Sequence, residues 1–380
     1  MQLPMSVSTL CIVLLATANQ QVLHAQDALG ARVDSLVRSA RAASGIPGLS
    51  VVVANRERIL LVRGYGYRRM GSDSGVDAST EYGIASLTKA FTATALAILV
   101  AEGRVSWDDP IRSHLPWFQT NDPWVTGRAT VGDLAAMRVG WPSGDSLVSE
   151  VRSLEALQAS LPRIPVGAFR ATHGQAGNLS YAILGQVLAH AAGASWEDAV
   201  AGRLLNPLGM SSTFTARSAA LSRGNVADSH MPSAAGIHTT QTRAVPPVLL
   251  PAAGLYSSAS DLGRWIRFHL GETPSGLDSA IADSARAMVQ SPQVLLGSFY
   301  QAIFRAPSSP VAYGYGWVVY NYRGTKVLEH AGAWAGYTSF LVILPELGVG
   351  FAILTNLRVD AVLDHIRTLR SEMINTFVAR

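Results

Sequence analysis

The sequence is almost free of cysteine, since Cys11 is the only one in 380 residues. It lies within the first 25 residues, so the chain that follows has neither a disulfide nor a thiol nucleophile. Charged residues are also scarce at 15%, no low-complexity tract occurs, and 48% of the residues are hydrophobic. This composition excludes a disordered protein and predicts a large core that is stable without cross-links.

Several motifs of other enzyme classes are missing. The sequence contains no G-x-S-x-G elbow, no H-E-x-x-H helix, no Walker loop and no paired cysteines, and its nine histidines are dispersed. We therefore predict neither a metal nor a cofactor. The net charge is +4, but the basic residues are scattered and no nucleic-acid-binding module is recognisable. Nucleic acid is accordingly excluded as a partner.

The N-terminus has the composition of an export signal. Residues 1–25 contain no acidic residue, lysine or arginine, carry an apolar run over 10–16, and end in Leu-His-Ala. This pattern predicts a signal peptide cut near Ala25, and hence a periplasmic or secreted protein. The apolar run is short for a membrane span, and the residues before Cys11 lack the pattern of a lipid anchor. No stable membrane anchor is expected.

Apolar periodicity divides the rest of the chain into α/β, helical and β regions. The expected elements are a helix over 28–43, strands over 49–54, 59–65, 316–320, 326–329, 337–344 and 349–355, and a helix over 359–377. The predicted fold class is α/β, more narrowly α+β, with an antiparallel sheet flanked by N- and C-terminal helices. The Pro- and Gly-rich middle is predicted to be an inserted, mainly helical lobe. Residues 26–380 then form one domain, with a sheet lobe over about 26–85 and 300–380 and a helical lobe over about 86–299.

The most informative segment begins at Ser86, three residues before Lys89. Lys89 is the only charged residue from Ser86 to Ala101, and the segment predicts a buried helix that ends at Gly103. Positions i and i+3 share a helix face, so the hydroxyl of Ser86 should lie beside the amine of Lys89. Burial lowers the pKa of a lysine, and a serine beside such a base is an activated nucleophile. The alternative is an ordinary core helix, capped by Ser86, from which Lys89 reaches the surface.

The chain resembles the penicillin-recognising serine hydrolases, the family of class C β-lactamases, D,D-peptidases, D-aminopeptidases and β-lactamase-like esterases. The resemblance covers about residues 30–377. It rests on the Ser-x-x-Lys motif at 86–89 and on ordered spacers at 107–111, 206–210, 254–262 and 315–317. It implies the β-lactamase/transpeptidase-like fold and an acyl-enzyme on Ser86 with Lys89 as base. The two expected lobes by themselves predict a cleft between them with the Ser86 helix at its floor.

The third family motif falls on the sequence His-Ala-Gly at 330–332. The resemblance implies that His330 lines the wall opposite Ser86 and that Gly332 lets the strand approach the substrate closely. It also implies that the backbone N–H of Ala333 joins that of Ser86 in an oxyanion hole. Histidine stands here where class C β-lactamases have lysine, which favours the peptidase and esterase branches.

The middle family motif is incomplete. The pattern Asn-x-x-Tyr-x-x-Leu-Gly at 178–185 identifies Asn178, which the resemblance implies orients the substrate and Lys89. Two residues earlier, Ala176 replaces the tyrosine that shuttles protons in the family. Three explanations stay open: Lys89 acts alone, His173 or another side chain of the longer preceding loop enters the site, or catalysis is lost.

These observations predict a serine hydrolase for small esters, D-amino-acid peptides or β-lactams. An esterase or peptidase is favoured over an efficient β-lactamase, because an alkoxide leaves with less help from a general acid than an amide nitrogen does. The rival hypothesis is a catalytically impaired family member that binds or senses peptidoglycan fragments. Retention of Ser86 and Lys89 argues against this rival, and Ala176 argues for it.

Overall fold

The structure is a computed structural model, and it describes residues 28–142, 151–170, 177–297 and 309–378. The predicted signal peptide and its cleavage at Ala25 lie outside these residues. Contacts divide the described chain into two units, residues 28–45 with 363–378, and residues 46–362. In the first unit a helix over 28–44 and the end of α15 (Val359–Val378) are joined by an ion pair of 3.5 Å between Arg32 and Glu372.

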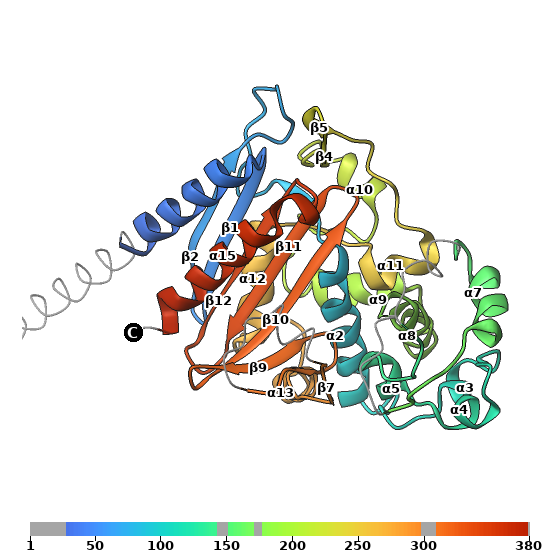
Figure 1. Cartoon of the computed structure of the whole chain (residues 1–380). Coiled ribbons are helices and arrows are strands. Elements are labelled where there is room, and N and C mark those ends of the chain that lie inside the picture. Colours follow the sequence, from blue (N-terminus) through green and yellow to red (C-terminus); the bar gives the residue numbers. More distant parts are fainter. Residues whose placement is uncertain (1–27, 143–150, 171–176, 298–308, 379–380) are drawn as a thin grey trace, which may run out of the picture. The chain divides into compact units, whose positions relative to one another are not determined.

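The second unit is built around an antiparallel eight-stranded sheet with the order β2-β1-β12-β11-β10-β9-β8-β7 (Figure 1). The strands are β1 (Gly48–Asn55), β2 (Ile59–Gly66), β7 (Val294–Leu295), β8 (Ala312–Tyr313), β9 (Val318–Tyr322), β10 (Thr325–Trp334), β11 (Tyr337–Leu344) and β12 (Val349–Thr355). Every residue of β11 and β12 is buried, so these two strands lie in the core. β10 runs past the end of β9, since their pairing stops at Glu329.

Between β2 and β7 most of the described regular secondary structure is helical. The helices are α2 (Thr88–Ala101), α3 (Ile111–His114), α4 (Pro123–Arg128), α5 (Val131–Ala135), α7 (Leu154–Ser160), α8 (Gly177–Ala192), α9 (Trp196–Val200), α10 (Arg217–Leu221), α11 (Leu250–Ala253), α12 (Ala259–His269) and α13 (Ser279–Val289). Short helical turns are η1 (Ala85–Leu87), η2 (Leu161–Arg163), η3 (Ala201–Leu205) and η4 (Pro247–Leu249). Two small ribbons pair β3 (Glu81–Gly83) with β6 (Tyr256–Ser258) and β4 (His230–Ser233) with β5 (Gly236–Thr239).

Close packing joins the helices to the sheet. On α12, a Cβ added at Gly263 would lie within 3.0 Å of side-chain atoms of Ile59 and Val52, so the helix rests directly on β1 and β2. The ring of Phe91 on α2 stacks on Trp265 of α12 with 3.9 Å between centroids. α2 is thereby fixed in the core, with its residues buried from Thr88 to Leu99.

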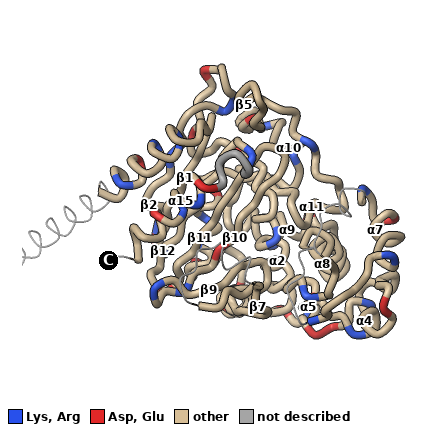
Figure 2. The backbone as a smooth tube through the Cα atoms, viewed as in Figure 1, with Lys and Arg blue, Asp and Glu red and all other residues tan. Residues whose placement is uncertain are grey.

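The predicted fold class is confirmed: the structure combines helices with an antiparallel sheet whose strands come from both ends of the chain. β10 extends five residues beyond the predicted strand and includes His330 and Gly332. The division into a sheet lobe and an inserted helical lobe stays a prediction. Charged residues are spread over many elements instead of collecting on one (Figure 2). Among the described residues, no helix combines the length and apolar character needed to cross a membrane.

Candidate active site

Ser86 is the only solvent-exposed residue in an otherwise buried segment. From Thr80 to Leu99 every residue is buried except Ser86, which is partly exposed. The preceding residue, Ala85, has a φ of +48°, a left-handed conformation that an alanine rarely adopts. This bend turns the chain between β3 and α2, and the hydroxyl of Ser86 is thereby exposed to solvent.

The prediction that Ser86 begins the buried helix is wrong by one short turn. Ser86 lies in the 3₁₀ turn η1, and α2 begins at Thr88. Residues three apart lie above one another in such a tight turn, so the predicted neighbours still meet. The Nζ atom of Lys89 is 2.9 Å from the Oγ atom of Ser86.

Lys89 does not reach the surface, since it is only 3% exposed. Its Nζ donates hydrogen bonds to the side-chain oxygen of Asn178 at 2.7 Å and to the backbone oxygen of Ala252 at 3.1 Å. A carbonyl oxygen only accepts, so these two groups hold two N–H bonds of Lys89 whatever its protonation state. The remaining tetrahedral position of Nζ then faces Ser86, which is where a neutral amine carries its lone pair.

Two further hydrogen bonds join the segment of α11 to α2. The backbone N–H of Leu255, just after α11, donates to the hydroxyl of Thr88 at 3.1 Å, and the hydroxyl of Thr92 donates to Pro251 at 2.7 Å. The segment that supplies Ala252 is therefore fixed to two turns of α2. On α8, one turn after Asn178, the ring of Tyr181 lies with its centroid 5.8 Å from the Nζ of Lys89.

Tyr181 belongs to the core. It is fully buried, and its hydroxyl donates to the backbone oxygen of Ala135 at 2.9 Å. Burial, reinforced by the neighbouring hydroxyls of Tyr313 and Tyr315, raises the pKa of Tyr181 well above its ordinary value. Tyr181 therefore stays protonated and acts as a wall beside Lys89, not as a substitute for the missing motif tyrosine.

Gly332 brings β10 into contact with the serine turn. A Cβ at this position would lie 2.2 Å from the backbone oxygen of Ile84 and 3.1 Å from the backbone nitrogen of Ser86. The hydroxyl of Ser339, opposite Gly332 on β11, donates to the same oxygen of Ile84 at 2.8 Å. Only a glycine allows this approach, and the next residue, Ala333, is exposed.

His330 lies two residues earlier on β10 and is 8% exposed. Its Nδ1 atom is 2.7 Å from the backbone oxygen of Ala331, and its Nε2 atom is 3.3 Å from the hydroxyl of Tyr313. Since a carbonyl oxygen only accepts, Nδ1 carries a proton. Both ring nitrogens are thus engaged by protein groups, which suits a wall residue better than a proton donor to substrate.

The predicted site residues separate into those that the structure describes and those that it does not. Ser86, Lys89 and Asn178 are directly hydrogen-bonded, and Gly332 abuts the backbone of Ser86. His173 and Ala176 lie outside the described residues. The last described residue before them, Arg170, is anchored by an ion pair of 2.7 Å to the buried carboxylate of Asp133.

Sequence reasoning missed Ala252 and Tyr313, whose roles depend on tertiary contacts. One available signal for the position of the site was the rarity of lysine, which draws attention to Lys89 because the chain contains only Lys89 and Lys326. Another was the spacer at 315–317: Gly316 has a φ of +81°, and a Cβ there would lie 2.8 Å from the Cα of Ala90 on α2. Within the described ranges, no group of three or more His, Cys, Asp or Glu side chains could hold a metal ion.

The fold and the site together define a class. A lysine buried beneath a partly exposed serine, next to a sheet strand that touches the serine through a glycine, places a candidate base beside a candidate nucleophile. The chain belongs to the beta-lactamase family, because the family model named Beta-lactamase matches residues 33–371. The resemblance inferred from the motifs is thereby confirmed.

Two curated relatives illustrate the range of the family. Penicillin-binding protein 4 of Amycolatopsis lactamdurans is 30% identical over 308 residues, which cover 77% of this chain and 76% of the relative. Protein flp of Staphylococcus aureus strain COL is 24% identical over 351 residues, which cover 90% of this chain. The chain spans only 66% of the length of that staphylococcal protein.

Solved structures show the same fold. A class C beta-lactamase superposes with a TM-score of 0.74 at 18% identity, covering 90% of this chain and 95% of its own. The octameric penicillin-binding protein homologue from Pyrococcus abyssi gives a TM-score of 0.73 at 23% identity, covering 86% of this chain and 73% of its own. At these identities the likeness establishes the fold alone.

Proposed function

We propose that this chain is a secreted or periplasmic serine hydrolase that forms an acyl-enzyme on Ser86. The observation that carries the proposal is the contact of 2.9 Å between Ser86 and Lys89, made where Asn178 and Ala252 hold the other two positions of the amine. In this arrangement Lys89 can accept the serine proton without moving.

The proposed reaction begins when the proton of Ser86 passes to the Nζ atom of Lys89 and Oγ bonds to the substrate carbonyl. The carbonyl oxygen becomes an oxyanion, which the backbone N–H groups of Ser86 and Ala333 would stabilise. Removing one such donor typically costs about 100- to 1,000-fold in rate. The contact between Gly332 and the nitrogen of Ser86 supports this assignment, because it brings the two backbones side by side.

The leaving group then departs with a proton from the ammonium of Lys89, and a water deprotonated by the same lysine hydrolyses the acyl-enzyme. Ala176 cannot shuttle protons, and Tyr181 and His330 are engaged elsewhere. Among the described residues, Lys89 is thus left to return the proton by itself, with no second group to relay it to the leaving atom. An alkoxide or phenoxide can leave without this relay, whereas an amide nitrogen must be protonated to leave. General acid assistance is worth about 100- to 10,000-fold. Small activated esters are therefore the preferred substrates in this proposal, ahead of D-amino-acid peptides and β-lactams.

The proposal is tested by measuring hydrolysis of p-nitrophenyl butyrate, a chromogenic cephalosporin and a D-alanyl-D-alanine peptide side by side, with Ser86→Ala as the inactive control. We expect ester hydrolysis to exceed both amide reactions by at least about 100-fold in kcat/KM. Ala176→Tyr is expected to raise amide turnover more than ester turnover. Efficient cephalosporin turnover by the natural sequence would contradict the ester preference.

Absence of any acylation would favour the rival function, in which the site binds peptidoglycan fragments without turning them over. Export is tested separately, by fractionation and by sequencing the N-terminus of the mature protein. Cleavage after Ala25 is the expected result.

A further inference from the structure

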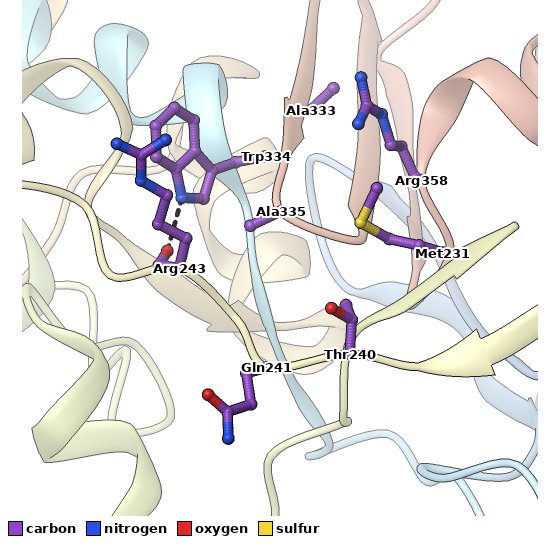
Figure 3. Close-up of a pocket in the computed structure, with 8 residues that line it drawn as sticks. All are labelled: Met231, Thr240, Gln241, Arg243, Ala333, Trp334, Ala335 and Arg358. Carbon is purple, nitrogen blue, oxygen red and sulfur yellow. Dashed lines mark hydrogen bonds between the residues drawn. The ribbon is translucent and has the colours of Figure 1, made fainter. Parts of the chain in front are cut away.

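A cavity of about 360 Å³ opens next to Ala333, at the end of β10. One side is the turn that joins β10 to β11, and the other is the ribbon of β4 and β5 with the residues that follow it (Figure 3). Because Ala333 lines this cavity and Gly332 touches Ser86, the cavity adjoins the proposed acylation site.

The cavity wall combines apolar and cationic groups. Trp334 and Met231 supply the apolar surface, and the indole N–H of Trp334 donates to the backbone oxygen of Arg243 at 2.9 Å. Figure 3 shows the side chain of Arg243 running beside this indole, and Arg358 on the side of Ala333 and Met231. None of the described residues that line the cavity is acidic.

Arg358 is held in place through its backbone. It follows β12, and its N–H donates to the backbone oxygen of His230 on β4 at 3.1 Å. Arg358 is therefore tied to β4, and Arg243 is tied to Trp334 at the end of β10. Guanidinium groups pair with carboxylates through charge-assisted hydrogen bonds, often two at a time.

The course of β10 decides which part of a substrate reaches this cavity. With the carbonyl oxygen between the N–H groups of Ser86 and Ala333, the strand leads back to His330 in one direction and forward to Trp334 in the other. The leaving group has to depart near Lys89, its proton donor, and Lys89 lies toward the His330 end. The hydroxyl of Tyr313 contacts His330 and neighbours Tyr181, whose ring lies beside the Nζ atom of Lys89. The acyl part is then the portion that extends past Ala333 into the cavity.

Building on the proposed function, we propose that this cavity binds the acyl part of the substrate and selects acyl chains that end in a carboxylate. The indole of Trp334 and the thioether of Met231 would cover the methylene groups, and the guanidinium groups of Arg243 and Arg358, one on each side of the cavity, would attract the carboxylate. A charged hydrogen bond gained in such a site corresponds to about tenfold or more in binding.

The test compares two esters of equal length, p-nitrophenyl hexanoate and mono-p-nitrophenyl adipate, with spontaneous hydrolysis subtracted. We expect the adipate to have about tenfold higher kcat/KM in the wild-type protein, and the ratio to fall as NaCl rises from 0.05 to 0.5 M. In the Arg243→Gln, Arg358→Gln double variant the ratio should fall to about one. Arg112→Gln, at an exposed position on α3, removes the same charge elsewhere and should keep the wild-type ratio.

A ratio of one in the wild-type protein, or a ratio unchanged in the double variant, overturns the proposal. A preference for 4-carboxyphenyl butyrate over mono-p-nitrophenyl adipate would also overturn it, because the carboxylate of 4-carboxyphenyl butyrate is on the leaving group. Calorimetric binding of both esters to Ser86→Ala gives a readout that does not need turnover. If neither ester is hydrolysed but the adipate binds about tenfold more tightly, the proposed function fails and the anion pocket stands.

Discussion

The floor and the rim of the site are built in different ways. The floor, from Thr80 to Leu99, is buried apart from Ser86 and is tied to α8, α11 and β10 by hydrogen bonds or close backbone contacts. The rim is the cavity beside Ala333 together with the ribbon of β4 and β5, and most residues of that ribbon are partly or fully exposed. The chemistry thus lies where a substitution disturbs packing, and the proposed selectivity lies where a substitution is structurally cheap.

The largest effect is expected from Lys89→Arg, a floor substitution that keeps the charge. An arginine stays protonated, so it cannot accept the proton of Ser86, and acylation should fall at least about 1,000-fold. The matched control is Lys326→Arg, which changes the only other lysine. Stopped-flow acylation rates and thermal unfolding of both variants check this. A Lys89→Arg protein with near-normal acylation would show that another group is the base.

Gly332→Ala should have the next largest effect. Its Cβ would lie 2.2 Å from the oxygen of Ile84, so β10 must move away from Ser86. We expect ester turnover to drop about 100-fold through the oxyanion hole, and the free energy of unfolding to fall by about 1–3 kcal/mol. Gly127→Ala is the control, because nothing lies within 4 Å of a Cβ there. If both variants behave like the wild type, the close approach of β10 is not needed.

A smaller, pH-dependent effect is expected at Glu81, which lies within the floor on β3. Burial raises the pKa of Glu81 to about 7, with Arg223 opposing and the carboxylates of Asp261 and Asp77 adding to the shift. The pKa is about 4.3 in the unfolded chain, so the folded state holds an extra proton between about pH 4.3 and 7. The free energy of unfolding should therefore decrease as the pH rises through this window.

Glu81→Gln removes this titration and should flatten the pH dependence by about 1 kcal/mol, after allowance for solvent screening. Urea unfolding of both proteins at pH 5, 6, 7 and 8 measures the difference. Parallel curves for wild type and variant would show that Glu81 ionises normally in the folded protein.

The contrast between floor and rim also decides what the sequence could predict. β1, β2, β11 and β12 were predicted to within a few residues because runs of Val, Ile and Leu between turn residues are typical of buried strands. The ribbon of β4 and β5 was missed, since short exposed strands have no such pattern. β10 was predicted too short because its second half is rich in alanine and glycine, which disfavour strands.

At the site, the pairing of Ser86 with Lys89 followed from their spacing, and the resemblance identified Asn178. The bend at Ala85 was not predictable, because a left-handed alanine is imposed by the surrounding structure. The hydrogen bond from Lys89 to the backbone oxygen of Ala252 was not predictable either, because the two residues are 163 positions apart in the sequence. Long-range partners of this kind depend on how the helices pack.

The central claim is that the floor presents one nucleophile, the hydroxyl of Ser86. The most direct measurement is the intact mass of the protein after exposure to a fluorophosphonate and, separately, to a penicillin, with peptide mapping of the adduct. The account predicts a single adduct on Ser86 with the fluorophosphonate, slow release of any penicilloyl adduct, and no adduct in Ser86→Ala. Labelling of a different serine, with Ser86→Ala as reactive as the wild type, would contradict it.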